Sequence, residues 1–374
     1  MSPPDLPWHP LPSSSSKATC EVYLLHAGSI DAPKDMVLLP GPNQPNDSID
    51  PPKDDGKAQV MVHMPVYVFL LHHKPTNNHY LFDLGMRTDL ENLPPFLKNH
   101  VIPSMKLAPK NPAHILQAHG SPAQQPENVK AVFVSHLHFD HIGDGAKDFP
   151  DAEIWVGPTA CTYARPGWPK DEKGVVLSDN LPTDGSRVIV EPFIPDDVLE
   201  KAGDGRAGMV EKGKSEGKYE AVESREPKDG WVGLGAFDRG YDVFDDGSAY
   251  ILDTPGHCSG HMMMLVRVKT REEGDDDFVV LAGDCFHHPI LLAEPERTAR
   301  PPYSKIGMHA QPELAVEAIW RTRAFAEKEN VWVIGAHDGS VGDALTSGKD
   351  EVEGLVLLND WRDKGWKKPL TSTL

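Results

Sequence analysis

The sequence predicts an α/β protein built from two similar halves. In both halves, short apolar runs typical of strands alternate with turns and with helix-like stretches. The clearest helix, residues 311–330, places apolar side chains near one stripe and leads directly into the apolar run at 331–338. The run VKAVFV likewise reads as a buried strand that leads into a turn rich in histidine. The sequence contains no short repeat, but strands, turns and helices alternate in both halves, so two similar α/β layers are expected.

The first half is predicted to begin with an extended Pro/Ser-rich arm at 1–19, with all later residues in a single domain. Residues 20–30 form the first convincing strand, and 60–73 pairs with 79–86 in a hairpin around the turn KPTNN. The other elements expected in this half are a proline-rich loop or lid at 39–57, a helical and irregular stretch at 88–126, a buried strand with a histidine-rich turn and a helix start at 127–144, a strand and short helix at 152–164, and a mobile or partly helical insertion at 196–230.

The second half is predicted to repeat this order. Residues 241–257 carry Asp-Asp-Gly between two apolar runs, which is typical of a β-hairpin turn. Strands are expected at 261–270 and 277–284, ahead of the helix at 311–330 and the strand that follows it. A last helix is expected at about 350–364.

The composition limits the classes of function that the chain can have. With 374 residues, of which 39% are hydrophobic, the chain can bury a sizeable core. Its net charge of −19 repels phosphate backbones, so no nucleic-acid partner is expected. The four cysteines lie far apart, which fits a reducing compartment and offers no zinc-finger framework. The sequence has no secretory leader pattern and no apolar run of about 18–20 residues, so we expect a cytoplasmic enzyme without a membrane partner.

The stretch SHLHFDHIGD, residues 135–144, concentrates imidazole directly after an apolar strand. In extended chain, residues i and i+2 project to the same side, so His136 and His138 can chelate one ion together. Asp140 and His141 are expected at the beginning of the following helix, where they can face a second ion. Neutral imidazole and carboxylate favour Zn²⁺, Mn²⁺, Fe²⁺ or Co²⁺. The motif therefore predicts a site for divalent metal.

Three later predicted strands also end in a residue that can bind metal: His257 after ILDTPG, Asp284 after VVLAG, and His337 after WVIGA. Ligand groups in α/β sheets gather outside the carboxyl ends of strands. If the four strand ends converge, they supply five histidines and two aspartates, enough for two ions. Two ions about 3.5–4 Å apart need a shared ligand, and Asp284 is the natural bridging carboxylate.

Isolated histidines are usually ordinary surface or core residues, and six others are interpreted in that way: His63, His72, His73, His79, His114 and His119. Three imidazoles at one buried strand end need compensation, which favours the metal interpretation for the motif. Cys258 and Cys285 flank predicted ligands, but they are interpreted as small buried residues rather than as ligands or nucleophiles.

The ordered set of H-x-H-x-D-H, His257, Asp284 and His337 resembles the metallo-β-lactamase superfamily. The segment FDLGM, residues 82–86, is similar to the Asp-x-Gly strand end of that family. The stretch SHLHFDHIGD is similar to its lactonase branch, which includes N-acyl homoserine lactonases. The resemblance covers roughly residues 20–340, apart from insertions near 39–57 and 196–230. It implies an αββα sandwich, in which two mixed sheets lie face to face with helices outside.

The resemblance also implies which residues bind which ion. The assignments are His136, His138 and His257 to the first ion, Asp140, His141 and His337 to the second, and Asp284 to both. Two divalent ions, with zinc as the first choice, are therefore the expected cofactors. Asp83 is the first candidate for a residue outside the ligand set that orients a ligand imidazole.

The resemblance implies hydrolysis of a small neutral carbonyl substrate, with a lactone ring as the first choice. A hydroxide shared by the ions attacks the carbonyl, and one ion stabilises the oxyanion. Asp140 accepts the proton of the water and returns it to the leaving alkoxide. Homoserine lactonases carry a tyrosine three residues after the bridging aspartate, whereas this chain has His287, either a catalytic donor to the oxyanion or a structural residue.

Other functions stay open at this point. Hydrolysis of a phosphotriester, an aryl ester or a lactam would use the same ions. A mononuclear iron sulfur dioxygenase also begins with H-x-H-x-D-H but leaves the second site empty. Redox di-iron members carry a glutamate where His138 stands, and a binding scaffold would lack ligands, so both are disfavoured. A small-molecule substrate is expected, and homodimer formation is left open.

Overall fold

The computed structural model describes residues 4–12, 16–41, 60–348 and 351–370, whose strands form two β-sheets. The nine-stranded sheet has the order β15-β1-β2-β3-β5-β6-β7-β8, with β4 also on β1, and its strands are β1 (Cys20–Pro33), β2 (Met61–His73), β3 (Asn78–Phe82), β4 (Lys106–Pro109), β5 (Val129–Val134), β6 (Glu153–Val156), β7 (Ile189–Pro192), β8 (Val222–Arg225) and β15 (Val356–Leu357). The six-stranded sheet has the order β14-β13-β12-β11-β10-β9, and its strands are β9 (Val232–Leu234), β10 (Phe237–Asp242), β11 (Ala249–Asp253), β12 (Met262–Lys269), β13 (Asp277–Leu281) and β14 (Val331–Ile334).

Both sheets are mixed. In the larger sheet, β1, β2 and β3 pair antiparallel, and β3, β5, β6, β7 and β8 pair in parallel. In the smaller sheet, β9 to β13 pair antiparallel and β14 runs parallel to β13. The α-helices are α1 (Lys34–Val37), α2 (Pro95–His100), α3 (Pro112–His119), α4 (Gly145–Asp148), α5 (Ala160–Ala164), α6 (Asp196–Ala202), α7 (Arg206–Ser215), α8 (Ile290–Ala293), α9 (Pro312–Ala326) and α10 (Gly339–Thr346). The 3₁₀-helices are η1 (Leu90–Asn92), η2 (Ile102–Ser104), η3 (Pro122–Gln124), η4 (Pro126–Asn128), η5 (Ser178–Asn180) and η6 (Pro295–Arg297). Within the described residues, no helix combines the length and apolar character that crossing a lipid bilayer requires.

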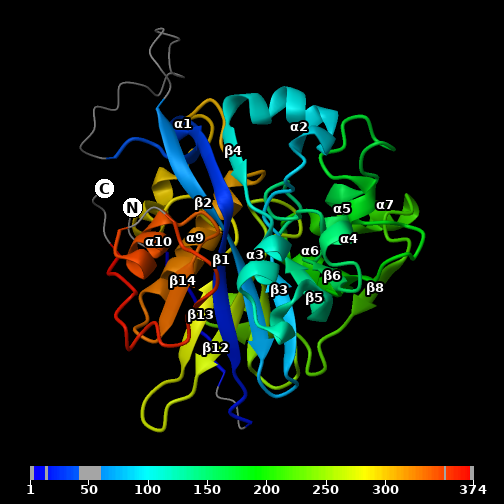
Figure 1. The fold of residues 1–374 in the computed structure, drawn as a ribbon. Coiled ribbons are helices and arrows are strands. Elements are labelled where there is room, and N and C mark those ends of the chain that lie inside the picture. Colours follow the sequence, from blue (N-terminus) through cyan, green and yellow to red (C-terminus); the bar gives the residue numbers. More distant parts are fainter. Residues whose placement is uncertain (1–3, 13–15, 42–59, 349–350, 371–374) are drawn as a thin grey trace.

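Side chains at alternating strand positions build two separate cores. Leu24 of β1 and Leu281 of β13 are fully buried in a core that joins the two sheets. The neighbouring Val280 of β13 belongs to a second core, which it shares with Ile319 of α9. Figure 1 shows α9 and α10 on the side of β13 and β14, and α4 to α7 on the side of β5 to β8. The predicted αββα sandwich is confirmed.

Most of the predicted elements are present in the described part of the chain. The two predicted hairpins are β2–β3 and β10–β11, and the helix expected at 311–330 is α9. The stretch at 88–126 holds α2 and α3, together with the unpredicted edge strand β4. Most of the proline-rich loop predicted at 39–57 lies outside the described residues.

The N-terminal arm lies against the six-stranded sheet and α9. His9 and Gly235 exchange two backbone hydrogen bonds, of 2.7 and 3.0 Å. The Trp8 ring packs against Phe325 with 5.2 Å between ring centroids. The boundary between this arm and the rest of the chain, placed at residue 19 from the sequence, stays a prediction.

The last helix predicted at about 350–364 is wrong. In the described part of this stretch, β15 pairs with β1 and the chain then turns. The Asn359 side chain accepts a hydrogen bond from the backbone N–H of Val22 in β1, at 2.9 Å, and donates one to the carbonyl of Val268 in β12, at 2.7 Å. Because this amide ties the segment to both sheets, tertiary contacts override the local helical pattern.

The insertion at 196–230 is partly helical, as predicted, and also contributes the edge strand β8. Arg206, the first residue of α7, is 1% exposed and donates to both carboxylate oxygens of Asp253 at 2.8 Å. Arg239 donates to the same carboxylate at 2.6 Å. Burial acts to raise the pKa of Asp253, but Arg206 and Arg239 outweigh it and hold the pKa below its ordinary range. This ion pair fixes the insertion to β11.

Replacing Arg206 with methionine is expected to lower the free energy of unfolding by about 3–5 kcal/mol, because it leaves Asp253 a buried and incompletely paired charge. Denaturant unfolding followed by circular dichroism measures this loss. The matched control is Lys201→Met, which removes an exposed pair with Asp197 and should change stability by about 0.5 kcal/mol or less. Equal stability of the two variants would contradict an anchoring role for Arg206.

Candidate metal centre

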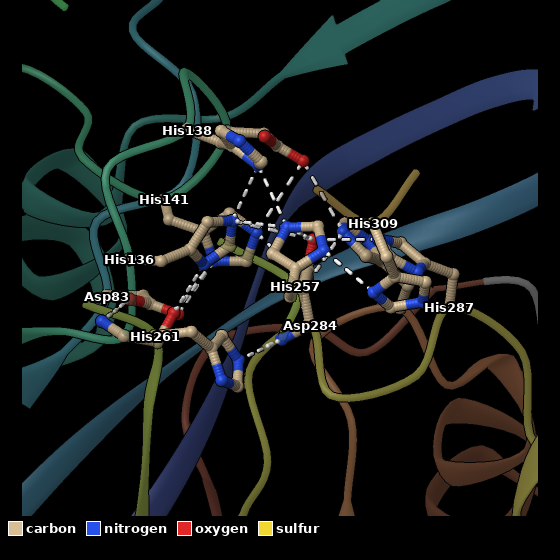
Figure 2. A network of polar contacts seen from close by, with 12 residues as sticks. Asp83, His136, His138, His141, His257, His261, Asp284, His287 and His309 are labelled. Atoms are coloured by element: carbon tan, nitrogen blue, oxygen red, sulfur yellow. Dashed lines mark hydrogen bonds and ion pairs between the residues drawn. The ribbon is translucent and has the colours of Figure 1, made fainter. Parts of the chain in front are cut away.

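The predicted ligands converge beyond the ends of four strands that belong to both sheets (Figure 2). They follow the strands in this way: His136, His138, Asp140 and His141 follow β5, His257 follows β11, Asp284 follows β13, and His337 follows β14. β13 and β14 are parallel neighbours, so their carboxyl ends lie at one edge of the sheet. The convergence that the sequence predicted is therefore present in the structure.

Asp140 and His141 lie in a turn, contrary to the prediction that they begin a helix. The next helix, α4, begins only at Gly145. The carbonyl of His141 accepts a hydrogen bond from the Leu84 N–H at 2.8 Å, which ties the turn to the end of β3. Because this carbonyl accepts a hydrogen bond from a distant segment, the chain turns here and does not begin a helix.

Gly283 allows the ends of β13 and β5 to approach each other. Its φ of +49° lies in the left-handed region. A Cβ at this position would lie 2.9 Å from the Cβ of Ser135. The absence of a side chain thus lets Asp284 reach the histidine-rich turn.

The first ligand group contains three imidazole nitrogens that nearly touch. His136 Nε2, His138 Nδ1 and His257 Nε2 lie 2.9–3.0 Å from one another. Asp284 Oδ2 lies 3.7 Å from His136 Nε2 and 3.6 Å from His257 Nε2. Each neutral imidazole has one N–H, so three mutual contacts cannot all be good hydrogen bonds. A tetrahedral ion with bonds of about 2.0–2.1 Å separates its ligand atoms by about 3.3 Å, which fits this group.

The second group lies on the other side of the same carboxylate. Asp284 Oδ1 is 3.1 Å from His141 Nε2 and 3.2 Å from His337 Nε2. Asp140 Oδ2 is 3.4 Å from His337 Nε2 and 3.6 Å from His141 Nε2. Among the described residues, His141 Nε2 and Asp284 Oδ1 are buried polar atoms without a hydrogen bond of normal geometry. Each such atom costs about 1–3 kcal/mol, and a bound cation would satisfy both.

Residues behind the two groups hold the imidazole rings in place. Their contacts are His136 Nδ1 to Ser135 Oγ at 3.1 Å, His141 Nδ1 to Asp83 Oδ2 at 2.8 Å, and His337 Nδ1 to the Pro65 carbonyl at 2.8 Å. Asp83 also accepts a hydrogen bond from the Ser135 N–H at 2.6 Å. The sequence predicted the position of Asp83, because its Asp-x-Gly pattern is recognisable.

Two nearby histidines were missed from the sequence. His261 is 1% exposed, and its Nε2 accepts a hydrogen bond from the Asp284 N–H at 3.2 Å. His309 precedes α9, and its Nδ1 lies 3.2 Å from His257 Nδ1. His261 follows His257 by four residues, a spacing that could have drawn attention to it, whereas His309 belongs to no motif with ligand spacing and only the folded chain reveals it.

The electrostatics of the site favour neutral imidazoles in the first group and positive charge in the second. Burial lowers the pKa of His136 and of His257 well below the ordinary value. In the second group burial also acts to lower the pKa, but the Asp284 carboxylate outweighs it and raises the pKa of His337 to about 10. The His141 pKa is raised for the same reason. Burial opposes ionisation of Asp284, but His141 and His337 hold its pKa well below the usual range. Neutral imidazoles and an ionised carboxylate are the forms that bind a divalent ion, so an ion at the second group would take the place of the protons on His141 and His337.

A cavity of about 300 Å³ opens onto both ligand groups. Its polar lining residues are His138, Asp140, His257, Asp284, His287 and His337, and its apolar lining residues include Met36, Met64, Leu97, Met105, Val175 and Met308. Among the described residues, its walls contain no Lys, Arg or Glu. A larger cavity of about 480 Å³ reaches only His337 of the predicted ligands. The smaller cavity is therefore the candidate substrate site.

His287 lines this cavity, and its Nε2 lies 3.1 Å from Asp284 Oδ2. It is 4% exposed. Cys258 and Cys285 are buried free thiols outside the ligand groups of the described residues. The Cys285 thiol contacts the Thr322 hydroxyl at 3.2 Å, which is typical of a packed core residue.

Comparison with known proteins identifies the family to which the chain belongs. A model of the metallo-beta-lactamase superfamily matches residues 61–271. The metallo-hydrolase mfmC of Annulohypoxylon moriforme is 30% identical over 233 residues, which cover 62% of this chain and 50% of that protein. A gamma-lactamase of Gibberella moniliformis is 32% identical over 211 residues, which cover 56% of this chain and 70% of that protein. The chain thus spans about half the length of mfmC.

A solved structure shares the same fold. It is an N-acyl homoserine lactone hydrolase with the product N-hexanoyl-L-homoserine bound at the catalytic metal center. The two chains superimpose with a TM-score of 0.52 at 19% identity, and the match covers 86% of this chain and 94% of that one. Because the family model covers more than half of the sequence and the sandwich fold agrees with it, the chain belongs to the metallo-β-lactamase superfamily.

Proposed function

We propose that this protein is a dinuclear metal-dependent hydrolase that opens a small lactone or a related cyclic ester. One observation carries the proposal: the Asp284 carboxylate lies between two imidazole groups. Its Oδ2 faces the first group, 3.6 Å from His257 Nε2, and its Oδ1 faces the second, 3.1 Å from His141 Nε2. A carboxylate placed in this way suits two ions that share a ligand. Zinc is the first choice for both ions, and Mn²⁺, Fe²⁺ or Co²⁺ suit the same donors.

The seven predicted ligands would hold the ions, with His136, His138 and His257 at the first, Asp140, His141 and His337 at the second, and Asp284 at both. When bound, such ions lower the pKa of a shared water towards about 7 and polarise the substrate carbonyl. The protein contributes a buried setting, in which electrostatic interactions are stronger than in water.

Asp140 is the proposed proton carrier. It lines the cavity, and its Oδ2 lies 3.4 Å from His337 Nε2. Burial opposes its ionisation, but His141 and His337 keep its pKa below the ordinary value, so it is an ionised acceptor. We assign its carboxylate to accept the proton of the attacking water and to return it to the leaving alkoxide.

His287 is the proposed donor to the developing oxyanion. In the absence of substrate, its Nε2 lies 3.1 Å from Asp284 Oδ2, which can accept that proton. The ring also lines the cavity, where the substrate carbonyl would arrive.

Replacing His287 with alanine is expected to lower kcat by about 10²–10³-fold, the usual effect of removing one oxyanion donor. Both ions should stay bound, because His287 is not among the proposed ligands. Steady-state kinetics and metal analysis on one preparation measure both quantities. Unchanged kcat in the alanine variant would assign His287 a purely structural role.

The cavity walls favour a small neutral substrate. Its apolar lining includes Met36, Met64 and Met308, and its described walls contain no Lys or Arg to pair with a carboxylate or phosphate of a charged substrate. Lactam hydrolysis is the second candidate, favoured by the 32% identity to a gamma-lactamase over 211 residues. A lactam and a lactone present the same carbonyl to the same ions.

A panel of lactones, lactams, aryl esters and phosphotriesters, assayed with metal-reconstituted protein, tests the proposal. We expect turnover of cyclic carbonyl substrates to exceed that of the phosphotriesters. A preparation that holds one iron per chain and consumes oxygen would overturn the hydrolase proposal in favour of a dioxygenase.

We also propose that the protein works in the reducing cytoplasm. The four cysteines, which are all buried and unpaired, support this location. A small molecule is the proposed binding partner. A homodimer is the proposed alternative to a monomer, and size-exclusion chromatography with light scattering distinguishes the two.

A further inference from the structure

Four of the five predicted histidine ligands of the centre have a contact on the nitrogen that faces away from the metal position. For three of them the supporting atom is an oxygen: Ser135 Oγ for His136, Asp83 Oδ2 for His141, and the Pro65 carbonyl for His337. His257 differs, because its Nδ1 lies 3.2 Å from Nδ1 of another imidazole, His309 (Figure 2). The His257 and His309 side chains are both buried, with 3% and 8% of the residue exposed.

The protonation of this histidine pair follows from its geometry. His257 Nε2 lies 3.0 Å from His136 Nε2 and 2.9 Å from His138 Nδ1, so it is the nitrogen available to an ion. A neutral imidazole that ligates through Nε2 carries its proton on Nδ1 and donates it to a neighbour. His309 Nδ1 must then accept, which places the His309 proton on Nε2. One tautomer of His309 is therefore compatible with metal binding by His257.

Backbone hydrogen bonds hold together the two segments that carry this histidine pair. The Ala310 N–H donates to the His257 carbonyl at 2.8 Å, and the Gln311 N–H donates to the Gly256 carbonyl at 2.9 Å. Gly256 has a φ of +133°, and a Cβ there would lie 2.7 Å from the backbone nitrogen of Ala315 in α9. The segment that leads into α9 thus packs directly on the loop that carries His257.

We propose that His309 is a positioning residue, which fixes the ring orientation and the tautomer of His257 by accepting a hydrogen bond from its Nδ1. The inference rests on the proposed metal centre and goes beyond it, since neither the family pattern nor the ligand spacing includes His309. Its alternative is a third ion held by His257, His287 and His309, whose candidate ligand atoms lie within 4.8 Å of one another.

Two substitutions of His309 separate hydrogen bonding from packing. In His309→Asn the amide oxygen takes the place of Nδ1 and keeps an acceptor for His257. His309→Leu removes the acceptor and keeps apolar bulk. A third variant, His309→Gln, moves the amide group one bond further out and replaces the leucine variant if that one does not fold. The control is His73→Leu, which changes a buried histidine at the far end of β2 whose ring contacts Thr76 and Asp246.

The measurement is zinc affinity by competition with a chromophoric chelator, together with the visible spectrum of the cobalt-substituted protein. We expect two ions per chain in the unchanged protein and a loss of about 10–100-fold in the affinity for one of them in His309→Leu, as is usual when a hydrogen-bond partner of a ligating histidine is removed. His309→Asn should stay close to the unchanged protein in affinity and in cobalt spectrum, and His73→Leu should bind zinc normally.

Four outcomes would overturn the inference or the proposal beneath it. Equal zinc affinity in all His309 variants would show that His309 orients nothing. An asparagine variant as weak as the leucine variant would show that the acceptor is irrelevant. Three ions per chain, of which His309→Leu loses only the third, would assign these residues to a separate metal site. Absence of zinc binding in the unchanged protein would overturn the proposed function itself.

Discussion

Replacement of Asp284 by asparagine is expected to lower kcat/KM by about 10³-fold or more and to release at least one metal ion. Asn keeps the shape of the side chain but removes the charge that faces both ligand groups, at 3.6 Å from His257 Nε2 and 3.1 Å from His141 Nε2. Metal ions supply several kcal/mol of transition-state stabilisation, and each factor of ten in rate corresponds to about 1.36 kcal/mol. Mass spectrometry of the metal content and steady-state kinetics on one preparation test both effects.

The matched control for this variant is Asp277→Asn. Asp277 begins β13, the strand whose far end leads to Asp284, and it is also buried. Its carboxylate accepts hydrogen bonds from Arg271 and Arg362, outside the metal centre. The control should lose stability while it keeps its ions and its turnover per folded molecule. Full turnover with two ions in Asp284→Asn would contradict the bridging role.

Asp140→Asn is expected to lower kcat by about 10²–10⁴-fold on whichever substrate is turned over, the usual contribution of general acid–base catalysis. Asn cannot accept the proton of the attacking water, although its amide oxygen can still face His337 as Asp140 Oδ2 does at 3.4 Å. We therefore expect the second ion to be retained when metal is in excess. The kinetics are compared at saturating metal, so that lost turnover reports on the proton rather than on an empty site.

Asp144→Asn is the corresponding control, since Asp144 lies on the same segment but pairs with Arg87 at 3.1 Å. Its replacement should leave kcat unchanged. Undiminished turnover in Asp140→Asn would refute the proton-carrier role, whatever the metal content.

The position of the candidate site was predictable from the sequence because its candidate ligands lie at strand ends. The alternation of side chains along an extended chain makes the His136 and His138 pair recognisable, and the apolar runs before Asp284 and His337 mark two further strand ends. The sequence also revealed the two hairpins and α9, because their turn residues and apolar stripe are local signals.

Features that depend on distant contacts were not predictable. The stretch near 350–364 was expected to be helical, but the bonds of Asn359 to both sheets hold it in a turn. His141 was expected in a helix, but its carbonyl pairs with Leu84, 57 residues earlier in the chain. His309 supports His257 across 52 residues of sequence, so no local pattern could reveal it.

Anomalous diffraction from crystals of zinc-reconstituted protein locates the ions and so tests the proposed two-ion centre. We expect two zinc peaks about 3.5–4 Å apart, one on each side of the Asp284 carboxylate, with the three imidazoles of His136, His138 and His257 around one of them. A single peak, or two peaks that do not share Asp284, would contradict it.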